Sequence, residues 1–449
     1  MNCPQLDIPG KDNYPSPLFC WSVGQIDNSH LSPPRSSFQS RCALARRKIG
    51  IWIIGAKGGV ASTVTVGLIA LKKGLAPQHG LVTQLPQFAD IDLAGFGDFT
   101  LGGHEIRDVS LYDEAMQMVR VSRAIDNDLV VKCKAELDKI DKNIKPGTLW
   151  NVGSKIEGIS GDEARKFKNK ETPRAAIDRL QKDLQEFQKK NDLDQVVVVN
   201  LASTEPPVDE AELPAKWKDL SKTLSKKTCA LPASSLYAIA ALELGLPFVN
   251  FTPSLGSAAP AIQELAIEKD TCHMGHDGKT GETLMKSVLA PMFAARNLPV
   301  MSWVGHNIFG NLDGKVLDDP ANKKTKVRSK DRLLHQILGY SPQTLVSIEY
   351  IESLGDWKTA WDHIHFQGFL GLPMVLTFQW QGADSLLAAP LVIDLVRLTE
   401  RAHRNGDRGL LKFLASFFKS PIGVANHNFV EQFQMLQEWA EKVAAMQRL

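Results

Sequence analysis

The chain has 449 residues, of which 43% are hydrophobic and 23% charged, and 52 Lys and Arg against 50 Asp and Glu give a net charge of +2. This near-balance argues against a binder of duplex nucleic acid, which would carry a strong basic excess, and the length favours two domains. The 6 cysteines are scattered without a C-x-x-C pair, which suits a reducing compartment. Without an apolar run long enough to cross a bilayer or a signal-peptide pattern, the sequence predicts a soluble cytoplasmic protein.

The N-terminal residues, 1–44, are rich in Pro and Ser without a sustained period, which predicts a poorly ordered tail. Order is expected to begin at RRKIGIWIIG, where a short β-branched run is typical of a buried parallel strand. After the glycines, VASTVTVGLIALKKGL has apolar residues at helical spacing. Strand, glycine turn and helix in this order predict the first βα unit of a doubly wound sheet.

The middle of the chain continues this alternation. The heavily charged residues 162–190 indicate a solvated helical face. The stretch DQVVVVNLASTEPP predicts a buried strand at 196–200, and SSLYAIAALELGLPFVNFTPS predicts a helix capped by Ser234 or Ser235, followed by a strand at 247–251. These repeats favour a parallel α/β sheet.

The pattern changes after Pro253. A long helix is predicted for TGETLMKSVLAPMFAARN, and strands are predicted within MSWVGHNIFGN, TLVSIEYI and PMVLTFQW. Because these strands are not each followed by a helix, they indicate a mixed or open sheet in a second domain. The strongly apolar DSLLAAPLVIDLVRLTERAHR predicts another helix, with two more helical stretches after it.

The turn IWIIGAKGGVAST has glycines where a strand meets a helix. A dinucleotide turn needs them so that backbone N–H groups can approach the pyrophosphate at the helix N-terminus. Gly55, Gly58 and Gly59 are available, but Lys57 stands where the second glycine of G-x-G-x-x-G would be. A dinucleotide site and a tight βα connection without a ligand both stay open on this evidence.

The dinucleotide fingerprint also requires an acid about 20 residues further on, to accept hydrogen bonds from ribose hydroxyls. Asp90 and Asp92 lie too far along the chain for a simple unit. Glu105, in LGGHEIRD, is the better candidate because glycines flank this carboxylate after a probable strand. An exposed loop acid is the alternative interpretation.

Lysines recur between Asp277 and Lys419, in HDGKTGETLMK, TKVRSK, SLGDWKTAWD and FFKSP. Lys326 and Lys330 are four apart and would share one face of a helix. A cluster of ammonium groups suits a phosphorylated sugar and a developing oxyanion. For any single lysine, a solvated surface position is the alternative. His273 and His276, in CHMGHDG, lack the ligand spacing of a metal site.

These segments resemble the myo-inositol-1-phosphate synthases, also called inositol-3-phosphate synthases, from about residue 48 to the C-terminus. The most specific segments are GLPFVNFTPS, DGKTGETLMKSVLAP, GHNIFGNLDG, SLGDWKTAWD and DSLLAAPLVIDL. The resemblance implies an α/β fold, with a Rossmann-type NAD domain at 45–252 and 386–449 and an inserted α+β catalytic and tetramer-forming domain at 253–385. It implies conversion of glucose 6-phosphate to myo-inositol 3-phosphate by oxidation at C5, enolisation, aldol cyclisation and re-reduction, with tightly held NAD.

The resemblance also implies the site residues. The cofactor set is Gly55, Gly58, Gly59, Ser62, Thr63, Glu105, Ala202, Ser203, Thr204 and Asp356. The catalytic set is Lys286, Lys326, Lys330, Lys358, Lys419, Asp277, Asn307 and Asp313. Lys286 or Lys358 is expected to take the O5 proton, and the other three lysines to hold phosphate or the O1 oxyanion. The resemblance leaves open whether a monovalent or divalent cation is bound, and no metal ligand is assigned.

Two departures from the family pattern concern the cofactor contacts: Lys57 replaces a turn glycine of many relatives, and the segment joining the first helix to Glu105 differs. Two other functions were weighed. An NAD-dependent sugar-phosphate dehydrogenase would need fewer lysines and would release NADH. A catalytically silent NAD-binding regulatory protein is disfavoured because all five matching positions are Lys. The expected uses of the inositol are phospholipid headgroups or a compatible solute.

Overall fold

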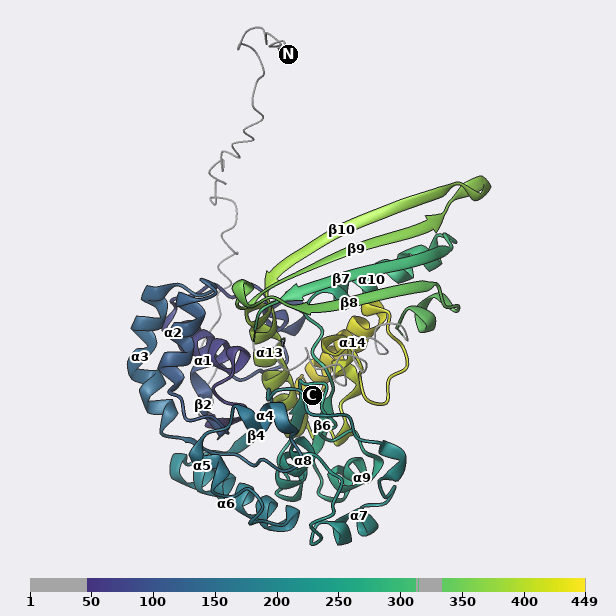
Figure 1. Ribbon diagram of the computed structural model, residues 1–449. Helices are drawn as coiled ribbons and strands as arrows, with labels where there is room; N and C mark the ends of the chain where they lie inside the picture. The colour runs from purple at the N-terminus through teal and green to yellow at the C-terminus, as the bar shows by residue number, and fades with distance from the viewer. Residues whose placement is uncertain (1–46, 312–313, 315–332, 449) are drawn as a thin grey trace, which may run out of the picture. The chain divides into compact units, whose positions relative to one another are not determined.

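The computed structural model describes residues 47–311, 314 and 333–448 (Figure 1). The predicted tail at 1–44 and three predicted site residues, Asp313, Lys326 and Lys330, lie outside the described residues. The described helices include none that combines the length and apolar composition needed to cross a membrane.

A parallel sheet forms the centre of the described chain. Within the described residues it has 7 strands in the order β11-β6-β5-β4-β1-β2-β3, and every pairing is parallel. The predicted doubly wound α/β fold and the strands at 49–54 and 196–200 are confirmed. The strands are β1 (Ile49–Ile54), β2 (Phe99–Glu105), β3 (Ile144–Pro146), β4 (Gln195–Asn200), β5 (Phe248–Asn250), β6 (Cys272–Gly275) and β11 (Gly409–Leu410).

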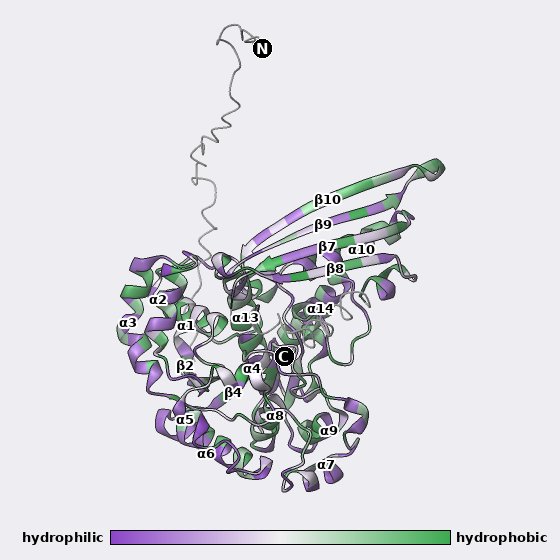
Figure 2. Cartoon of the chain, viewed as in Figure 1, coloured by the Kyte–Doolittle hydropathy of each residue, from purple (hydrophilic) through white to green (hydrophobic). Residues whose placement is uncertain are grey.

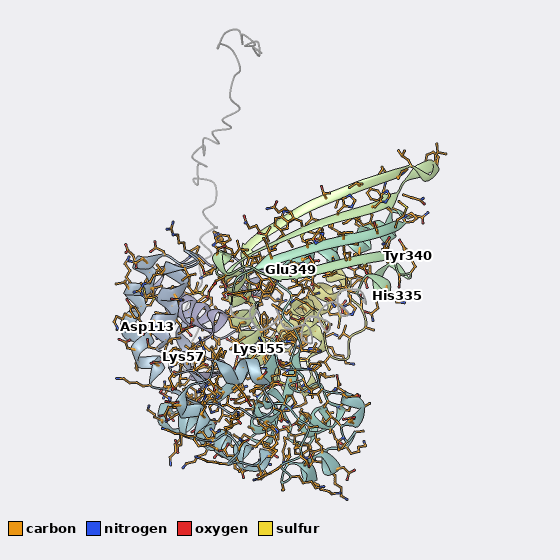
Figure 3. The ribbon with its side chains drawn as sticks, viewed as in Figure 1. Lys57, Asp113, Lys155, His335, Tyr340 and Glu349 are labelled. Atoms are coloured by element: carbon orange, nitrogen blue, oxygen red, sulfur yellow. The ribbon has the colours of Figure 1, made fainter. Side chains whose placement is uncertain are left out.

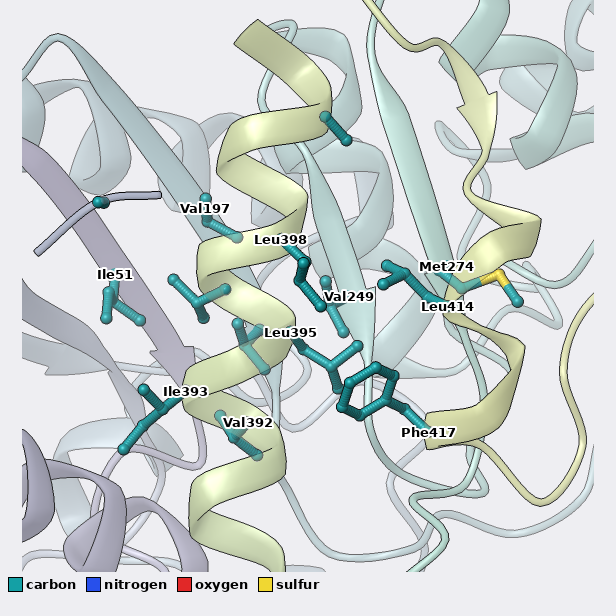
Figure 4. Close-up of a cluster of buried hydrophobic side chains, with 14 of the residues drawn as sticks. Ile51, Val197, Val249, Met274, Val392, Ile393, Leu395, Leu398, Leu414 and Phe417 are labelled. Atoms are coloured by element: carbon teal, nitrogen blue, oxygen red, sulfur yellow. The ribbon is translucent and has the colours of Figure 1, made fainter. Parts of the chain in front are cut away.

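Helices cover both faces of this sheet. Alternate residues of β1 separate into two cores: Ile51 packs with Val392 and Leu395 on one face, and Trp52 packs with Leu180 on the other. Figure 4 shows the first core, where the long helix that carries Val392 and Leu395 crosses the strands. That face is covered by α1 (Gly59–Lys73), α13 (Asp384–Asn405), η8 (Lys412–Phe417) and α14 (Phe429–Gln447), and the other by α6 (Pro173–Asn191), α8 (Ala233–Glu243) and α9 (Pro260–Glu268).

Shorter elements join these layers. Helices α2 and α3 pack on each other and on α1 in a third apolar cluster. The other described α-helices before α8 are α2 (Leu111–Arg120), α3 (Asn127–Asp141), α4 (Ser154–Gly158), α5 (Asp162–Arg165) and α7 (Trp217–Thr223). The 3-10 turns are η2 (Val82–Gln84), η3 (Pro86–Phe88), η4 (Phe96–Asp98), η5 (Glu210–Glu212), η6 (Glu352–Leu354) and η7 (Phe369–Gly371).

A second sheet is mixed, as predicted. Its described strands are β7 (Val300–Phe309), β8 (Gln343–Tyr350), β9 (Trp357–Gln367) and β10 (Pro373–Ala383), in the order β10-β9-β7-β8. Helix α10 (Glu282–Ala295) covers one face, where Phe293 packs against Trp303 and Ile364. The other face carries exposed apolar side chains, Leu345 at 55% and Trp361 at 41% exposure. Hydrophobic and hydrophilic residues are intermingled along these strands (Figure 2), and apolar side chains occur on the open face as well as on the covered one.

Two local expectations were not met. Helix α8 begins at Ala233 after Pro232, so Ser234 and Ser235 are buried inside it and do not cap it. Strand β9 was not predicted, because charged and histidine residues interrupt its apolar positions. Strand β6 pairs in the parallel sheet although it follows residue 252, and the proposed domain boundaries stay a prediction.

Candidate active site

The turn after β1 requires a glycine at its first position. Gly55 has a φ of +76°, and a Cβ there would lie 2.8 Å from the Cα of Ala202, so a larger residue would be strained and would collide with the loop after β4. The N–H groups of Gly55 and Ala56 donate to the carbonyl of His104, at 2.9 and 3.1 Å. Gly58 is the N-cap of α1 and has no side chain to offer, so N–H groups of the first helical turn are suited to an anionic ligand.

A cavity of about 430 Å³ opens at the carboxyl ends of β1, β2 and β4. This size suits a small-molecule or cofactor site, and the carboxyl edge of a parallel sheet is where such folds bind nucleotides. Most of the predicted site residues line this one cavity. Local sequence patterns alone could not predict that residues so far apart in the chain lie together. They are Gly55, Gly58, Gly59, Glu105, Ala202, Ser203, Thr204, Asp277, Asp356, Lys358 and Lys419.

Glu105 ends β2 and lies against the glycine turn. Its Oε2 accepts from the Lys57 N–H at 2.9 Å, and its Oε1 accepts from the Ile106 and Arg107 N–H groups at 2.9 and 3.1 Å. It is only 7% exposed, so the alternative of an exposed loop acid is wrong. A carboxylate at the end of the strand beside β1 is where the dinucleotide fingerprint needs one, and the ribose contact itself stays a prediction.

Arg107 was not predicted, although it is two residues from Glu105. Its Nη2 donates to the Lys57 carbonyl at 2.6 Å, and its Nη1 pairs with Glu114 Oε2 at 3.0 Å. Burial lowers the Arg107 pKa, but the Glu105 and Glu114 carboxylates outweigh this, so the pKa lies above its ordinary value. The guanidinium therefore stays charged and fastens the turn to β2 and α2.

The hydroxyls of Ser62 and Thr63 donate to backbone carbonyls of the glycine turn and of α1. Ser62 Oγ donates to the Lys57 carbonyl at 3.5 Å, and Thr63 Oγ1 donates to the Gly59 carbonyl at 2.8 Å. Both residues are buried, and neither is among the described residues that line the cavity. Their predicted cofactor contacts stay a prediction that this geometry does not support.

Asp356 joins three separate segments at the edge of the cavity. Its Oδ2 accepts from the Ser385 N–H at 2.9 Å and its Oδ1 from the Ser385 hydroxyl at 2.6 Å, while its own N–H donates to Ser122 Oγ at 2.8 Å. Burial raises the pKa of Asp356 to about 6. A Cβ at Gly59 would come within 2.9 Å of Ser385 Oγ, so this cluster lies directly beside the glycine turn.

Two of the predicted lysines face the cavity, each near a carboxylate. Lys419 Nζ donates to Asp277 Oδ1 at 2.9 Å, and Lys358 Nζ lies 3.9 Å from Asp384 Oδ2. Their side chains are 21% and 22% exposed. Both also line a smaller cavity of about 30 Å³ with Asn307, so this part of the site can present two ammonium groups to an anionic ligand.

Lys286 lies elsewhere, between α10 and the mixed sheet. Its Nζ is 2.7 Å from Glu282 Oε1, 4.0 Å from Asp362 Oδ1 and 5.8 Å from the centre of the Trp303 ring. The side chain is 2% exposed and does not contribute to the lining that the described residues form. Of the two lysines predicted to take the O5 proton, the structure therefore favours Lys358.

Glu205 is a cavity residue that was not predicted. Its carboxylate accepts from both the N–H and the hydroxyl of Ser234, and its own N–H donates to Ser254 Oγ at 3.0 Å. It thereby caps the N-terminus of α8 from another segment, which explains why that helix needs no local cap. Burial raises the pKa of Glu205 to about 7. Its position directly after Ala202–Ser203–Thr204 could have indicated it.

The histidines of CHMGHDG give no indication of a metal site. The Nδ1 of His273 lies 2.8 Å from Ser257 Oγ, and burial lowers the His273 pKa to about 4, which keeps the ring neutral. In the part of the chain that the structure describes, no three His, Cys, Asp or Glu side chains are grouped to hold a metal ion.

Comparisons with known proteins agree with this architecture. The family model for myo-inositol-1-phosphate synthase, an NAD-binding family, matches residues 49–441. The chain is 33% identical to inositol-3-phosphate synthase 1 of Bacteroides thetaiotaomicron, over 86% of this chain and 92% of that one. Identity to inositol-3-phosphate synthase isozyme 1 of Arabidopsis thaliana is 29%, over 83% and 78%.

Solved structures share the fold. Inositol-3-phosphate synthase from Caenorhabditis elegans superposes with a TM-score of 0.80 at 23% identity, covering 89% of this chain and 86% of that one. A myo-inositol-1-phosphate synthase-related protein from Thermotoga maritima gives a TM-score of 0.71 at 26% identity, covering 88% and 99%.

Proposed function

The chain belongs to the myo-inositol-1-phosphate synthase family, and we propose that it converts D-glucose 6-phosphate to 1D-myo-inositol 3-phosphate with NAD and no net redox change. The observation that carries this function is the family match across residues 49–441. It is supported by a single cavity that combines a glycine turn with two lysines. The protein is accordingly an enzyme of the intramolecular isomerase type.

The described residues fit the NAD that this family binds. Gly55, Gly58 and Gly59 would leave room for the pyrophosphate at the start of α1, and Glu105 would accept from the ribose hydroxyls. The loop 202–204 and Asp356 would lie along the rest of the cofactor. When bound, NAD supplies the acceptor for a hydride from the sugar and later returns that hydride.

The residues of the chain would handle protons and charge. Oxidation at C5 requires loss of the O5 proton. We propose that Lys358, which faces the cavity, accepts this proton as a general base. Negative charge then develops on O5 and later on O1. Lys419, held by Asp277, is oriented before the reaction and would stabilise such an oxyanion. Lys326 and Lys330, outside the described residues, remain proposed contacts to the phosphate or O1, and Asp313, also outside them, remains a proposed residue of the pocket lining.

An assay of the purified protein with glucose 6-phosphate and NAD⁺ tests this function. We expect an inositol phosphate to form without net NADH. Accumulation of NADH would instead indicate the sugar-phosphate dehydrogenase. If neither product forms while NAD⁺ binds, the protein is the silent regulatory alternative.

We also propose that the enzyme is a cytoplasmic homotetramer whose product supplies phospholipid headgroups. The open face of the mixed sheet, with Leu345, Trp361 and Val375 exposed, is suited to contact with further copies of the chain. Three buried cysteines, Cys133, Cys229 and Cys272, are free thiols, which agrees with a reducing compartment.

A further inference from the structure

The ammonium group of the lysine in the glycine turn is held by residues outside the cavity lining. Lys57 Nζ lies 2.8 Å from Asp141 Oδ1 and donates to the Val109 carbonyl at 2.6 Å. Its side chain is only 12% exposed, and it does not belong to the cavity lining that the described residues form. Figure 3 labels Lys57 in the region of α1, α2 and α3.

The partner of Lys57 is itself placed by two helices. Asp141 is the last residue of α3, and the same Oδ1 accepts from the N–H of Leu111, the first residue of α2, at 3.3 Å. An ammonium shared between a carboxylate and a backbone carbonyl makes charge-assisted hydrogen bonds, which are stronger than neutral ones. Lys57 therefore links the turn to the ends of both helices.

The backbone of Lys57 is engaged as well. Its N–H donates to Glu105 and its carbonyl accepts from Arg107. With both backbone groups and the ammonium bound, this residue has little freedom to move relative to β2, α2 and α3. The next two residues, Gly58 and Gly59, line the cavity, so the position of Lys57 determines where their backbone lies.

We propose that Lys57 is a positioning residue for the cofactor: through its ion pair with Asp141 it holds the turn where Gly58, Gly59 and the start of α1 meet the pyrophosphate of NAD. This inference rests on the proposed function, because NAD is the ligand that the turn would hold. A turn held in place before binding loses less conformational entropy when the ligand arrives. The lysine takes the place of a turn glycine without contributing its charge to the phosphate.

The test compares Lys57→Met, Asp141→Asn and the double variant as full chains, by calorimetric titration with NAD⁺. Each single variant should bind NAD⁺ about tenfold more weakly than the wild type, since a small misplacement of a binding group is costly. The double variant should be no weaker than the weaker single variant, because both changes remove the same link. Asp141→Asn is the discriminating variant. If Lys57 contacts phosphate directly, freeing its ammonium would leave NAD⁺ affinity unchanged or improve it, and that result would overturn the proposal.

Lys73 provides a matched control. It also joins α1 to α3 by an ion pair and a backbone hydrogen bond, with Nζ 2.7 Å from Glu136 Oε1 and 2.9 Å from the Lys132 carbonyl, but it lies at the far end of α1 from the turn. Lys73→Met should keep wild-type NAD⁺ affinity, and thermal unfolding without NAD⁺ reports any loss of stability separately. If the Lys57 and Asp141 variants bind like Lys73→Met, the positioning role is wrong while the proposed function stands. If the wild type itself does not bind NAD⁺, both are wrong.

Discussion

Among the described residues, helices cover the parallel sheet on both faces, whereas a helix covers the mixed sheet on one. In β1, Ile51 and Trp52 point to opposite faces and are 1% and 0% exposed. In the mixed sheet, Trp303 on the covered face is 0% exposed, whereas Trp361 on the open face is 41% exposed. The parallel sheet is therefore complete within one chain, and the mixed sheet retains an apolar surface that a further copy could cover.

Two buried carboxylates, one beside each sheet, are held differently. Beside the parallel sheet, Glu205 is held by N–H and hydroxyl donors. Beneath the mixed sheet, Lys286 and Glu282 form an ion pair in which each side chain is 2% exposed. A carboxylate held by neutral donors can release its charge by taking up a proton, whereas an ion pair fails when either partner is removed. This difference predicts distinct responses to mutation and to pH.

The largest effect is expected for Lys286→Met. It removes the ammonium and leaves the Glu282 charge in a buried position, so the free energy of unfolding should fall by about 3 to 5 kcal/mol. Urea denaturation measures this, and Lys73→Met, at a partly exposed pair, should change stability by less than about 1 kcal/mol. If Lys286→Met is as stable as the wild type but inactive, Lys286 has the catalytic role that the sequence predicted.

The effect of Glu205 on the pH dependence of stability tests how the region beside the parallel sheet accommodates a buried carboxylate. Burial raises its pKa from 4.5 to about 7, so the folded state binds this proton more tightly than the unfolded state. The corresponding stability is present below pH 4.5 and is lost as the pH rises from 4.5 to 7, by up to about 3 kcal/mol. Glu205→Gln should not show this loss.

Thermal melts of both proteins between pH 5 and 8 provide the measurement. Asp356 and Asp394, whose pKa values burial also raises to about 6, contribute to both proteins and cancel in the difference. Glu438→Gln, at an exposed position on α14, should follow the wild-type profile. Parallel profiles for wild type and Glu205→Gln would contradict the prediction.

Lys419→Ala tests the cavity, which lies at the boundary between the parallel sheet and the mixed sheet. Loss of a fixed cation whose effect increases as the oxyanion forms should lower kcat by about 100-fold. NAD⁺ affinity should stay close to that of the wild type, because the turn is a separate part of the cavity. Steady-state kinetics and NAD⁺ titration measure the two effects, with the exposed Lys412→Ala as control. Normal turnover would remove Lys419 from the proposed mechanism.

The smallest effect concerns the open face. Trp361→Glu places a charge on this apolar surface and should weaken self-association by about tenfold or more. Ile267→Glu changes an equally apolar residue that is 68% exposed on α9, and it should leave assembly unchanged. Sedimentation velocity across a range of concentrations measures both. A fully active wild-type monomer would refute the proposed tetramer.

Four strands of the parallel sheet, β1, β2, β4 and β5, were predictable because their signals are local, whereas β3, β6 and β11 were not predicted. Runs such as Ile49–Ile54 are apolar on both faces, and the glycines after them indicate the turn directly. Strand β9 was missed because Asp362 and Lys358 lie on its covered side, in polar clusters that only the folded chain forms. A pattern of apolar residues cannot reveal a buried ion pair.

The site residues show the same limit. The resemblance indicated Glu105 and Lys358, and the fold brings them to one cavity. It could not reveal that Glu205 caps a helix that begins 28 residues later, since that contact depends on the loop after β4 meeting α8. Likewise, the sequence placed Lys286 in the site, but the direction of its side chain is decided by Glu282, one helical turn away.

The position of α13 has a consequence for synthesis of the chain. This helix forms much of the cover over one face of β1, yet it begins at Asp384, and β1 ends at Ile54. At translation rates of about 5 to 20 residues per second, the ribosome needs roughly 15 to 60 seconds to make the intervening chain. During this time the strands at the amino end would leave an apolar face exposed to other nascent proteins. We therefore expect newly made chains to depend on molecular chaperones until α13, in the last seventh of the polypeptide, has emerged.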